Sequence, residues 1–391
     1  MYVLILLFCI SLLGGQLFRM PLYRGITVFP HDIILCVLFL YWRFIEKGSH
    51  TVTKLRLFLP IQLFFCAILI SLAINISSHT IPASLEAIAY ALRFFLYISL
   101  YAIVSHTTYP KVWLRGLYAA GVLTAFLGVV QYIWYPDLRY LQYLGWDPHY
   151  FRLFSIFLDP NFAGMFIIFT LYLGIAIWNK TKYRMFGIGV QLVLLLCLVM
   201  TLSRSSYLAF SVSFIFYALW TKQWKWIFAL MVFISAVFFL PLPFRSITPI
   251  TRETTSIARW NNWVVSTRYF SNKPIFGYGF NYLRSIQEPQ SSDETARISH
   301  ASGGVDNSFL FVLITTGIVG GSAFLYLLWT LFTIGRTCSN HVKTRVFGNV
   351  YLASLVALCT HSMFNNSFFY PWMLIWLWIL TALVERKNYK T

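Results

Sequence analysis

Residues 307–333 read NSFLFVLITTGIVGGSAFLYLLWTLFT, and no charged side chain interrupts them. An α-helix needs about 20 consecutive apolar residues to cross the hydrocarbon core of a bilayer, so this stretch is long enough to span a membrane. Inside a bilayer, only helices and closed barrels satisfy every backbone hydrogen bond. A chain that repeats such a stretch along its length is therefore built from transmembrane helices.

The rest of the chain repeats the pattern. Of its 391 residues, 59% are hydrophobic and only 11% are charged, whereas soluble domains average about 25% charged residues. The sequence predicts an all-α polytopic membrane protein, with residues 1–391 forming a single integral membrane domain of about twelve transmembrane helices. The predicted spans are residues 1–15, 27–42, 57–74, 85–104, 113–133, 161–178, 184–202, 205–220, 224–242, 307–333, 347–364 and 369–384.

Several other classes of protein are not indicated. The six cysteines show no CxxC spacing and five lie in apolar segments, so we expect no disulfide framework, metal site or cofactor. The net charge of +18 is not accompanied by a nucleic-acid-binding motif, and we expect no nucleic-acid partner. The N-terminal stretch MYVLILLFCISLLGG lacks a positive n-region and a cleavage site, which indicates a retained first helix.

Basic residues predict the orientation. With the N-terminus inside, the inner loops and tail hold 17 of the 30 lysines and arginines, while the outer loops hold 12, seven of them in one long loop. Cytoplasmic loops carry an excess of such residues, and long loops count little toward it. We therefore expect both termini to be cytoplasmic, and the polar groups discussed next to lie on the outer face.

The longest outer loop, residues 243–304, joins the ninth and tenth predicted spans. Its aromatic residues and its turn, KPIFGYGFN, predict that it is partly helical and ordered. If the segment IARWNNW is helical, Arg259 and Trp263 share a face, and Arg268 adds a further cation. Two interpretations fit these residues: an anion-binding surface, or an amphipathic helix lying on anionic membrane lipid.

Arg204 lies in TLSRSSYLAF, at the hinge between the seventh and eighth predicted spans. An arginine among serine hydroxyls offers a fork of donors that suits a phosphate. A snorkelling arginine at the membrane interface is the equal alternative.

Arg93 lies in the middle of the fourth predicted span, two turns after Glu86 on the same face. An arginine inside a membrane faces a cavity or a partner charge. It is therefore a candidate for substrate binding, and a structural ion pair with Glu86 is the alternative.

Asp159 and Asn161 open the sixth span in FLDPNFAGMF. Asp-Pro-Asn is a good helix start, so Asp159 is expected to cap the helix, and a cap also can line a cavity.

His300 and Asp306 lead into the tenth span and are the two candidate proton acceptors of this outer region. Asn307 follows and is expected to cap the span or to orient a substrate. The alternative is that Asp306 and Asn307 serve only as the helix cap.

Four landmarks occur in order: DPN before the sixth span, SRSS before the eighth, a long-loop pattern, and DNSFLFVLITTGIVG at the tenth. In the loop, Trp263 follows Arg259 by four residues, and Pro274 follows it by fifteen and precedes the sequence Gly277-Tyr278-Gly279. Together these resemble the O-antigen ligase and O-antigen polymerase superfamily of bacterial membrane proteins.

The resemblance implies a metal-independent membrane glycosyltransferase of the GT-C type in the bacterial cytoplasmic membrane. Such proteins take a glycan from a polyprenyl diphosphate carrier on the outer leaflet and join it to a glycan or lipid-linked glycan acceptor. Arg204 and Arg259 would bind the diphosphate and stabilise the charge that grows as it leaves. The resemblance also implies flippase and chain-length regulator proteins as partners.

One position departs from the family pattern. Ligases of the family often carry a histidine directly before the asparagine at the tenth span, and here that residue is Asp306. Three explanations fit: Asp306 is the base, His300 replaces it from six residues upstream, or orientation and leaving-group stabilisation suffice. The departure favours a polymerase slightly over a ligase. A solute or bicarbonate transporter of the same superfamily is the alternative, although no internal repeat or pair of broken helices is evident.

Overall fold

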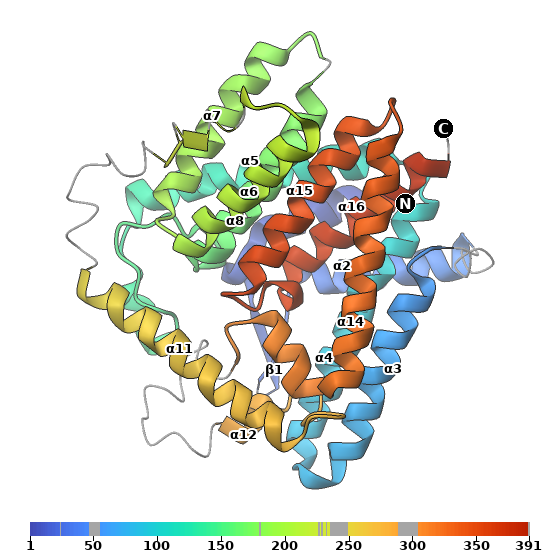
Figure 1. Cartoon of the computed structure of the whole chain (residues 1–391), viewed down its shortest axis with the longest axis vertical. Coiled ribbons are helices and arrows are strands. Elements are labelled where there is room, and N and C mark those ends of the chain that lie inside the picture. The colour runs from blue at the N-terminus through green and yellow to red at the C-terminus, as the bar shows by residue number, and fades with distance from the viewer. Residues whose placement is uncertain are drawn as a thin grey trace.

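The computed structural model describes residues 1–23, 25–46, 55–179, 181–225, 227, 230, 231, 233, 234, 249–287 and 304–389. The chain is mainly helical (Figure 1). Its α-helices are α1 (Tyr2–Ser11), α2 (Pro30–Leu40), α3 (Phe58–Asn75), α4 (Ile81–His106), α5 (Pro110–Trp134), α6 (Pro160–Trp178), α7 (Arg184–Met200), α8 (Arg204–Thr221), α11 (Pro249–Asn272), α12 (Leu283–Gln287), α14 (Ser308–Asn340), α15 (Arg345–Ser362) and α16 (Pro371–Tyr389).

Helices occupy the predicted spans, except that the ninth, 224–242, lies largely outside the described residues. Five helical segments are long and apolar enough to cross a membrane: Phe58–Ser78, Ile81–His106, Pro110–Trp134, Pro160–Trp178 and Ser308–Asn340. Shorter apolar helices cover Tyr2–Phe18 and Arg184–Met200. The chain is therefore a multi-pass membrane protein, and the count of twelve spans stays a prediction.

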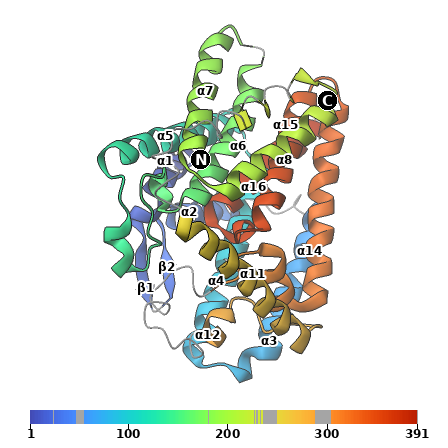
Figure 2. The ribbon, with the colours of Figure 1, turned by 60° about the vertical axis from the view of Figure 1, so that its left-hand side comes forward.

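The all-α expectation misses a small β-hairpin. Strands β1 (Met20–Tyr23) and β2 (Ile26–Val28) pair antiparallel, with Met20 opposite Val28. The β-branched residues of β2 favour extended backbone. Figure 2 shows the hairpin at the end of the bundle where α11 and α12 also lie.

Helix α16 forms the centre of the bundle. It packs against α4, α14 and α15, while α15 packs on α8, α14 and α6. Nearly every residue from Trp372 to Val384 is buried, including three tryptophans. A helix that is apolar on all sides is stable only when it is surrounded, as this one is.

Helix α14 is broken at Gly317, where φ is +65° and ψ is −165°. The predicted turn KPIFGYGFN is confirmed, with Gly277 and Gly279 both at positive φ, and it docks into this break. The amides of Ile318 and Val319 donate to the carbonyl groups of Pro274 (2.8 Å) and Ile275 (3.3 Å), and the turn returns two amides to the carbonyls of residues 314 and 315. The backbone groups freed by the break are thus satisfied, as a membrane interior requires.

The docked turn fixes the C-terminal end of α11. Figure 1 shows α11 running obliquely past the broken end of α14, with which it is in contact. The segment IARWNNW is helical, as expected from its sequence. The rigid turn therefore sets where the side chains of α11 lie relative to the bundle.

Candidate functional site

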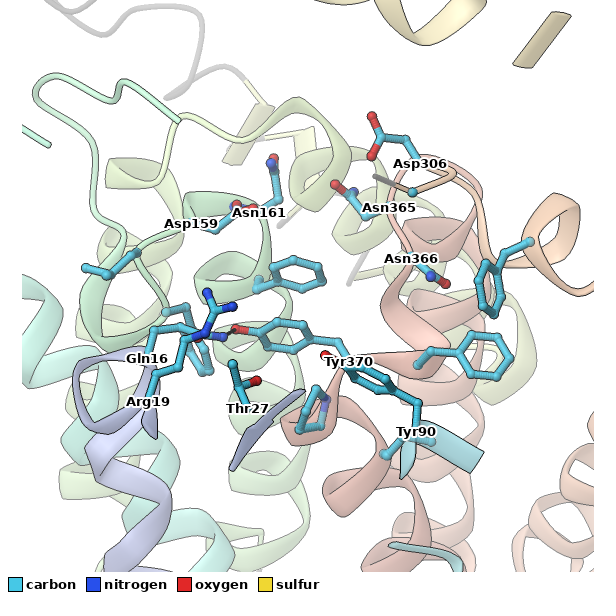
Figure 3. A pocket seen from close by; sticks show the side chains of 18 of the residues that line it. Gln16, Arg19, Thr27, Tyr90, Asp159, Asn161, Asp306, Asn365, Asn366 and Tyr370 are labelled. Atoms are coloured by element: carbon cyan, nitrogen blue, oxygen red, sulfur yellow. Dashed lines mark hydrogen bonds between the residues drawn. The ribbon is translucent and has the colours of Figure 1, made fainter. Parts of the chain in front are cut away.

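A cavity of about 440 Å³ lies at the α11 end of the bundle. A pocket of this size is sufficient for a small ligand. Segments that are far apart in sequence line it, namely residues 16–29, 145–162, 304–311 and 365–371 with parts of α4 and α11. Figure 3 shows Gln16 and Arg19 on one side, and Asp306 and Asn365 on another. We call it the polar cavity.

A second cavity of about 300 Å³ adjoins α8 and α11. Its lining is largely apolar apart from two arginines, Arg204 and Arg259. The other lining residues are Ser205, Leu208, Trp260, Trp263 and Phe364. We call it the arginine cavity. Arg259 lines both cavities, so this residue lies between them. The two arginines predicted to act together are thus brought together from α8 and α11.

The predicted cap at α6 is confirmed. The Asp159 side chain accepts a hydrogen bond from the Asn161 amide (2.7 Å), and both residues line the polar cavity. The Asn161 side-chain oxygen accepts from the hydroxyls of Ser203 (2.7 Å) and Ser205 (3.2 Å). This ties the start of α6 to the hinge that carries Arg204, which is itself exposed.

Asn307 caps α14, accepting from the amides of Phe309 (2.9 Å) and Leu310 (3.1 Å). Its neighbour Asp306 lines the polar cavity. Burial raises the pKa of the Asp306 carboxyl, the Arg259 guanidinium opposes this rise, and the Asp159 carboxylate adds to it. Asp306 is therefore a better proton acceptor than an exposed aspartate once it is ionised.

Arg93 lines the polar cavity, but its ion-pair partner is not Glu86, the partner that local spacing suggested. Its guanidinium binds the Asp32 carboxylate of α2, with Nη2 2.7 Å from Oδ2 and Nε 3.2 Å from Oδ1. The Tyr97 hydroxyl donates to the same carboxylate, and the Phe29 ring lies 4.9 Å from the guanidinium carbon. Glu86 lines the cavity separately.

The remaining predicted site residues are Trp263, Arg268 and His300, and only Trp263 lines a cavity among the described residues. Trp263 lines the arginine cavity, and its buried indole nitrogen has no hydrogen-bond partner among the residues that the structure describes. Arg268 is exposed and lines neither cavity, so its placement gives no support to a role in substrate binding. His300 lies outside the described residues. Within the described ranges, no group of histidine, cysteine and carboxylate side chains is arranged to hold a metal ion.

Residues 189–325 match the family model for O-Antigen ligase. Over these residues the chain is similar to the O-antigen ligase and polymerase superfamily. No curated protein matches the chain in a sequence search. The matched region runs from α7 into α14 and contains both arginines of the arginine cavity and Asp306. This similarity supports an enzymatic role and lipid-linked glycan substrates.

The O-antigen ligase match does not include one wall of the polar cavity. Trp146, Asp147 and His149 line it from the connection between α5 and α6, and the sequence pattern did not single them out. The Asp147 side chain is exposed, yet partial desolvation by the surrounding protein and repulsion by the Asp159 and Asp306 carboxylates raise the pKa of its carboxyl to about 6. The local signal in the sequence was the stretch GWDPH, which places an aspartate and a histidine among aromatic residues.

Proposed function

We propose that this protein is a GT-C-type glycosyltransferase of the bacterial cytoplasmic membrane that works on the outer face, with both termini in the cytoplasm. It transfers or polymerises oligosaccharide units carried on polyprenyl diphosphate, and polymerisation is slightly favoured over ligation. The observation that carries the proposal is the position of Arg259, which lines both the polar cavity and the largely apolar arginine cavity.

The arginine cavity suits the donor. A polyprenyl diphosphate combines an apolar chain with a strongly anionic group, and this cavity combines apolar side chains with two guanidinium groups. Arginine pairs two phosphate oxygens at once. The buried indole N–H of Trp263, which lacks an acceptor among the described residues, offers one further hydrogen bond. Arg204 and Arg259 would thus hold the diphosphate and stabilise its charge as it leaves.

The polar cavity suits the acceptor. In the proposed reaction, the acceptor hydroxyl oxygen attacks the anomeric carbon of the donor glycan. The bond from this carbon to the phosphate oxygen breaks, and polyprenyl diphosphate leaves with the bonding electrons. The hydroxyl proton passes to Asp306, or to His300 in its place. Arg259 is suitably located for this step because it meets the leaving group from one cavity and faces Asp306 in the other.

The test uses purified protein in nanodiscs and lipid-linked oligosaccharide extracted from cells that lack the protein. Elongated lipid-linked product and released polyprenyl diphosphate are measured by mass spectrometry. We expect Arg204→Ala and Arg259→Ala each to lower turnover on the order of 100-fold, as the loss of one charge-stabilising donor does. Arg268→Ala is the matched control, since it removes the same charge from an exposed position on α11.

Each result has a defined meaning. Product from the donor alone indicates a polymerase, and product only with a second acceptor indicates a ligase. Wild-type turnover in both arginine variants, or an equal loss in Arg268→Ala, contradicts the proposed donor site. Donor binding without product or diphosphate release would instead favour the transporter alternative. Against that alternative, hydrogen bonds to Asp32 and Tyr97 hold Arg93, the charge that an ion path would use, in place.

A further inference from the structure

The connection between α5 and α6, residues 135–159, forms one wall of the polar cavity. Gly145 lies in the left-handed region (φ +86°) and turns the chain, so that Trp146 and Asp147 line the cavity. Trp146 also packs against a small apolar cluster of Leu138, Phe154 and Leu158. The segment therefore presents an aromatic ring and a carboxylate next to each other at the rim.

This segment is held at both of its ends. Near its start, Asp137 binds Arg139 (2.6 Å) and pairs with Tyr150 across a β-bridge. Near its end, the Gln131 side-chain oxygen of α5 accepts from the amides of Phe154 (3.0 Å) and Ser155 (3.1 Å). An ordered connection of this length is usually functional rather than a passive linker.

Arg152 attaches the same segment to the hinge between α7 and α8, which carries Arg204 of the arginine cavity. Its guanidinium donates to the carbonyl oxygens of Thr201 (3.0 Å) and Leu202 (3.2 Å), directly before Ser203 and Arg204. Three non-glycine residues, Phe151, Ser155 and Leu158, adopt positive φ values of 47° to 54°. Such conformations persist only where the surroundings enforce them, and they cluster at ligand-binding sites.

The carboxylates of the polar cavity differ in what already binds them. Asp159 caps α6 and accepts the Asn161 amide. By contrast, the side chains of Asp147 and Asp306 accept no hydrogen bond from any described residue and both line the cavity. Two carboxylates are thus left for a ligand that can donate hydrogen bonds, and they come from segments that precede and follow α6 in the sequence.

We propose that residues 135–159 are the acceptor-recognition segment, in which Trp146 stacks on an acceptor sugar ring and Asp147 accepts a hydrogen bond from one of its hydroxyls. This rests on the proposed glycosyltransferase function. Asp147 takes no proton in the transfer: it binds and orients the sugar, while Asp306 receives the proton. The aromatic and amide side chains elsewhere in this cavity, such as Phe162, Asn365 and Asn366, are typical of a carbohydrate site.

The test separates the two cavities with two probes on full-length protein in nanodiscs. One probe is the free glycan, released by mild acid from lipid-linked units extracted from cells without the protein. The other is geranylgeranyl diphosphate, which carries no sugar. We expect Asp147→Asn and Trp146→Ala to weaken glycan binding about tenfold, the effect of losing one hydrogen bond to a charged group or one stacking contact, and to leave diphosphate binding unchanged.

Two comparisons make the result specific. Tyr140→Ala alters the same segment at a side chain that is 73% exposed and does not line the cavity, so both probes should bind as in wild type. Arg204→Ala should show the opposite pattern, losing diphosphate binding and keeping glycan binding. Unchanged glycan affinity in both Asp147→Asn and Trp146→Ala, or equal losses for both probes, would overturn the inference.

The transfer assay distinguishes this inference from the function beneath it. Suppose that the wild type elongates its substrate and that the Asp147→Asn and Trp146→Ala proteins have the wild-type KM for the acceptor. The proposed glycosyltransferase function is then supported, and the role of residues 135–159 in acceptor recognition is wrong. If the wild type neither elongates nor releases polyprenyl diphosphate, the function itself fails and the inference with it.

Discussion

Asp306 and Asp147 line the same cavity, but their surroundings differ. Asp306 lies directly before the cap of α14 and faces Arg259, the residue common to both cavities. Asp147 lies at the rim, where Asp159 and Asp306 raise its pKa and Arg152 and Arg259 lower it. On the proposed mechanism, Asp306 would lie near the leaving group and Asp147 would hold the incoming sugar.

This difference predicts two effects of pH. A carboxyl group accepts a proton only when ionised, and a raised pKa means that ionisation is lost at a higher pH than usual as the pH falls. We expect transfer to decline as the pH falls through about 6, the pKa of Asp147, as acceptor binding weakens. Asp306→Asn should lower kcat at every pH on the order of 100-fold, the scale of a lost general base, and Asp306→Glu should restore part of it.

Steady-state transfer rates from pH 4.5 to 8, measured at several acceptor concentrations, check these effects. Asp147→Asn should remove the pH dependence of acceptor KM. Its persistence in that variant would assign the titration to another group, and an unchanged kcat in Asp306→Asn would leave His300 as the base. This pH range extends roughly two units on either side of the pKa of Asp147, which is about 6.

At single residues, sequence predicted what depends on local pattern. The caps by Asp159 and Asn307 follow from short motifs and are confirmed. The partner of Arg93 was not predictable in this way, because Asp32 comes from a helix 61 residues earlier, whereas Glu86 lay on the same helix face. Asp147 was missed for the same reason: only the folded chain brings it near Asp306.

Among the elements, the broken helix α14 and its docked turn are the most consequential. Gly317 has positive φ, and a Cβ there would overlap the Ile275 carbonyl group. Gly277 meets α14 equally closely from the other side. The turn fixes the end of α11. The backbone conformation at these two glycines therefore affects the position of Arg259, more than a dozen residues away.

We therefore expect Gly317→Ala to destabilise the protein by more than the 1 kcal/mol or so that a positive φ costs an alanine, because the overlap is with backbone. Diphosphate binding should weaken as α11 loses its anchor. Thermal unfolding in detergent and geranylgeranyl diphosphate titration measure the two effects. Gly189→Ala is the control, since a Cβ at that α7 position meets nothing within 4 Å; equal behaviour of the two variants would remove the turn's anchoring role.

The turn itself was predictable, because its glycines and proline are typical of a bend. Its docking was not, since the hydrogen bonds join residues 274–279 to residues 314–319. The hairpin β1–β2 was missed because each strand has only three or four residues, too few to show a clear alternation between apolar and polar positions.

In the whole molecule, segments predicted to lie on opposite sides of the membrane gather at opposite ends. The polar cavity is lined by segments predicted to be outside, such as residues 145–149, and by residues of predicted spans, such as Arg93. On the other side, Glu385 of α16 accepts hydrogen bonds from the Tyr101 hydroxyl and the Arg56 amide, and Trp220 donates to Ser339 (2.9 Å). The helix order could be predicted because hydropathy is local, whereas the packing around α16 could not.

Accessibility in intact cells tests the predicted orientation. With an impermeant thiol reagent, a cysteine introduced by Tyr140→Cys should be labelled directly, and one introduced by Lys182→Cys only after the membrane is permeabilised. Both side chains are exposed, and the native exposed cysteines, Cys36 and Cys66, lie within apolar helices. The reverse labelling pattern would place both cavities in the cytoplasm and contradict a donor bound from the outer leaflet.

The shared position of Arg259 also bears on how such an enzyme diversifies. The arginine cavity is built mostly from the region that matches the O-antigen ligase model, while much of the polar cavity comes from residues 16–29, 86–97 and 145–162, which lie outside that match. On the proposed roles of the two cavities, one part of the chain binds the lipid carrier and another part binds the incoming sugar. Drift in the N-terminal part can then create new polysaccharide structures while the carrier chemistry stays intact, which is the separation that lineages under pressure to vary their surface would exploit.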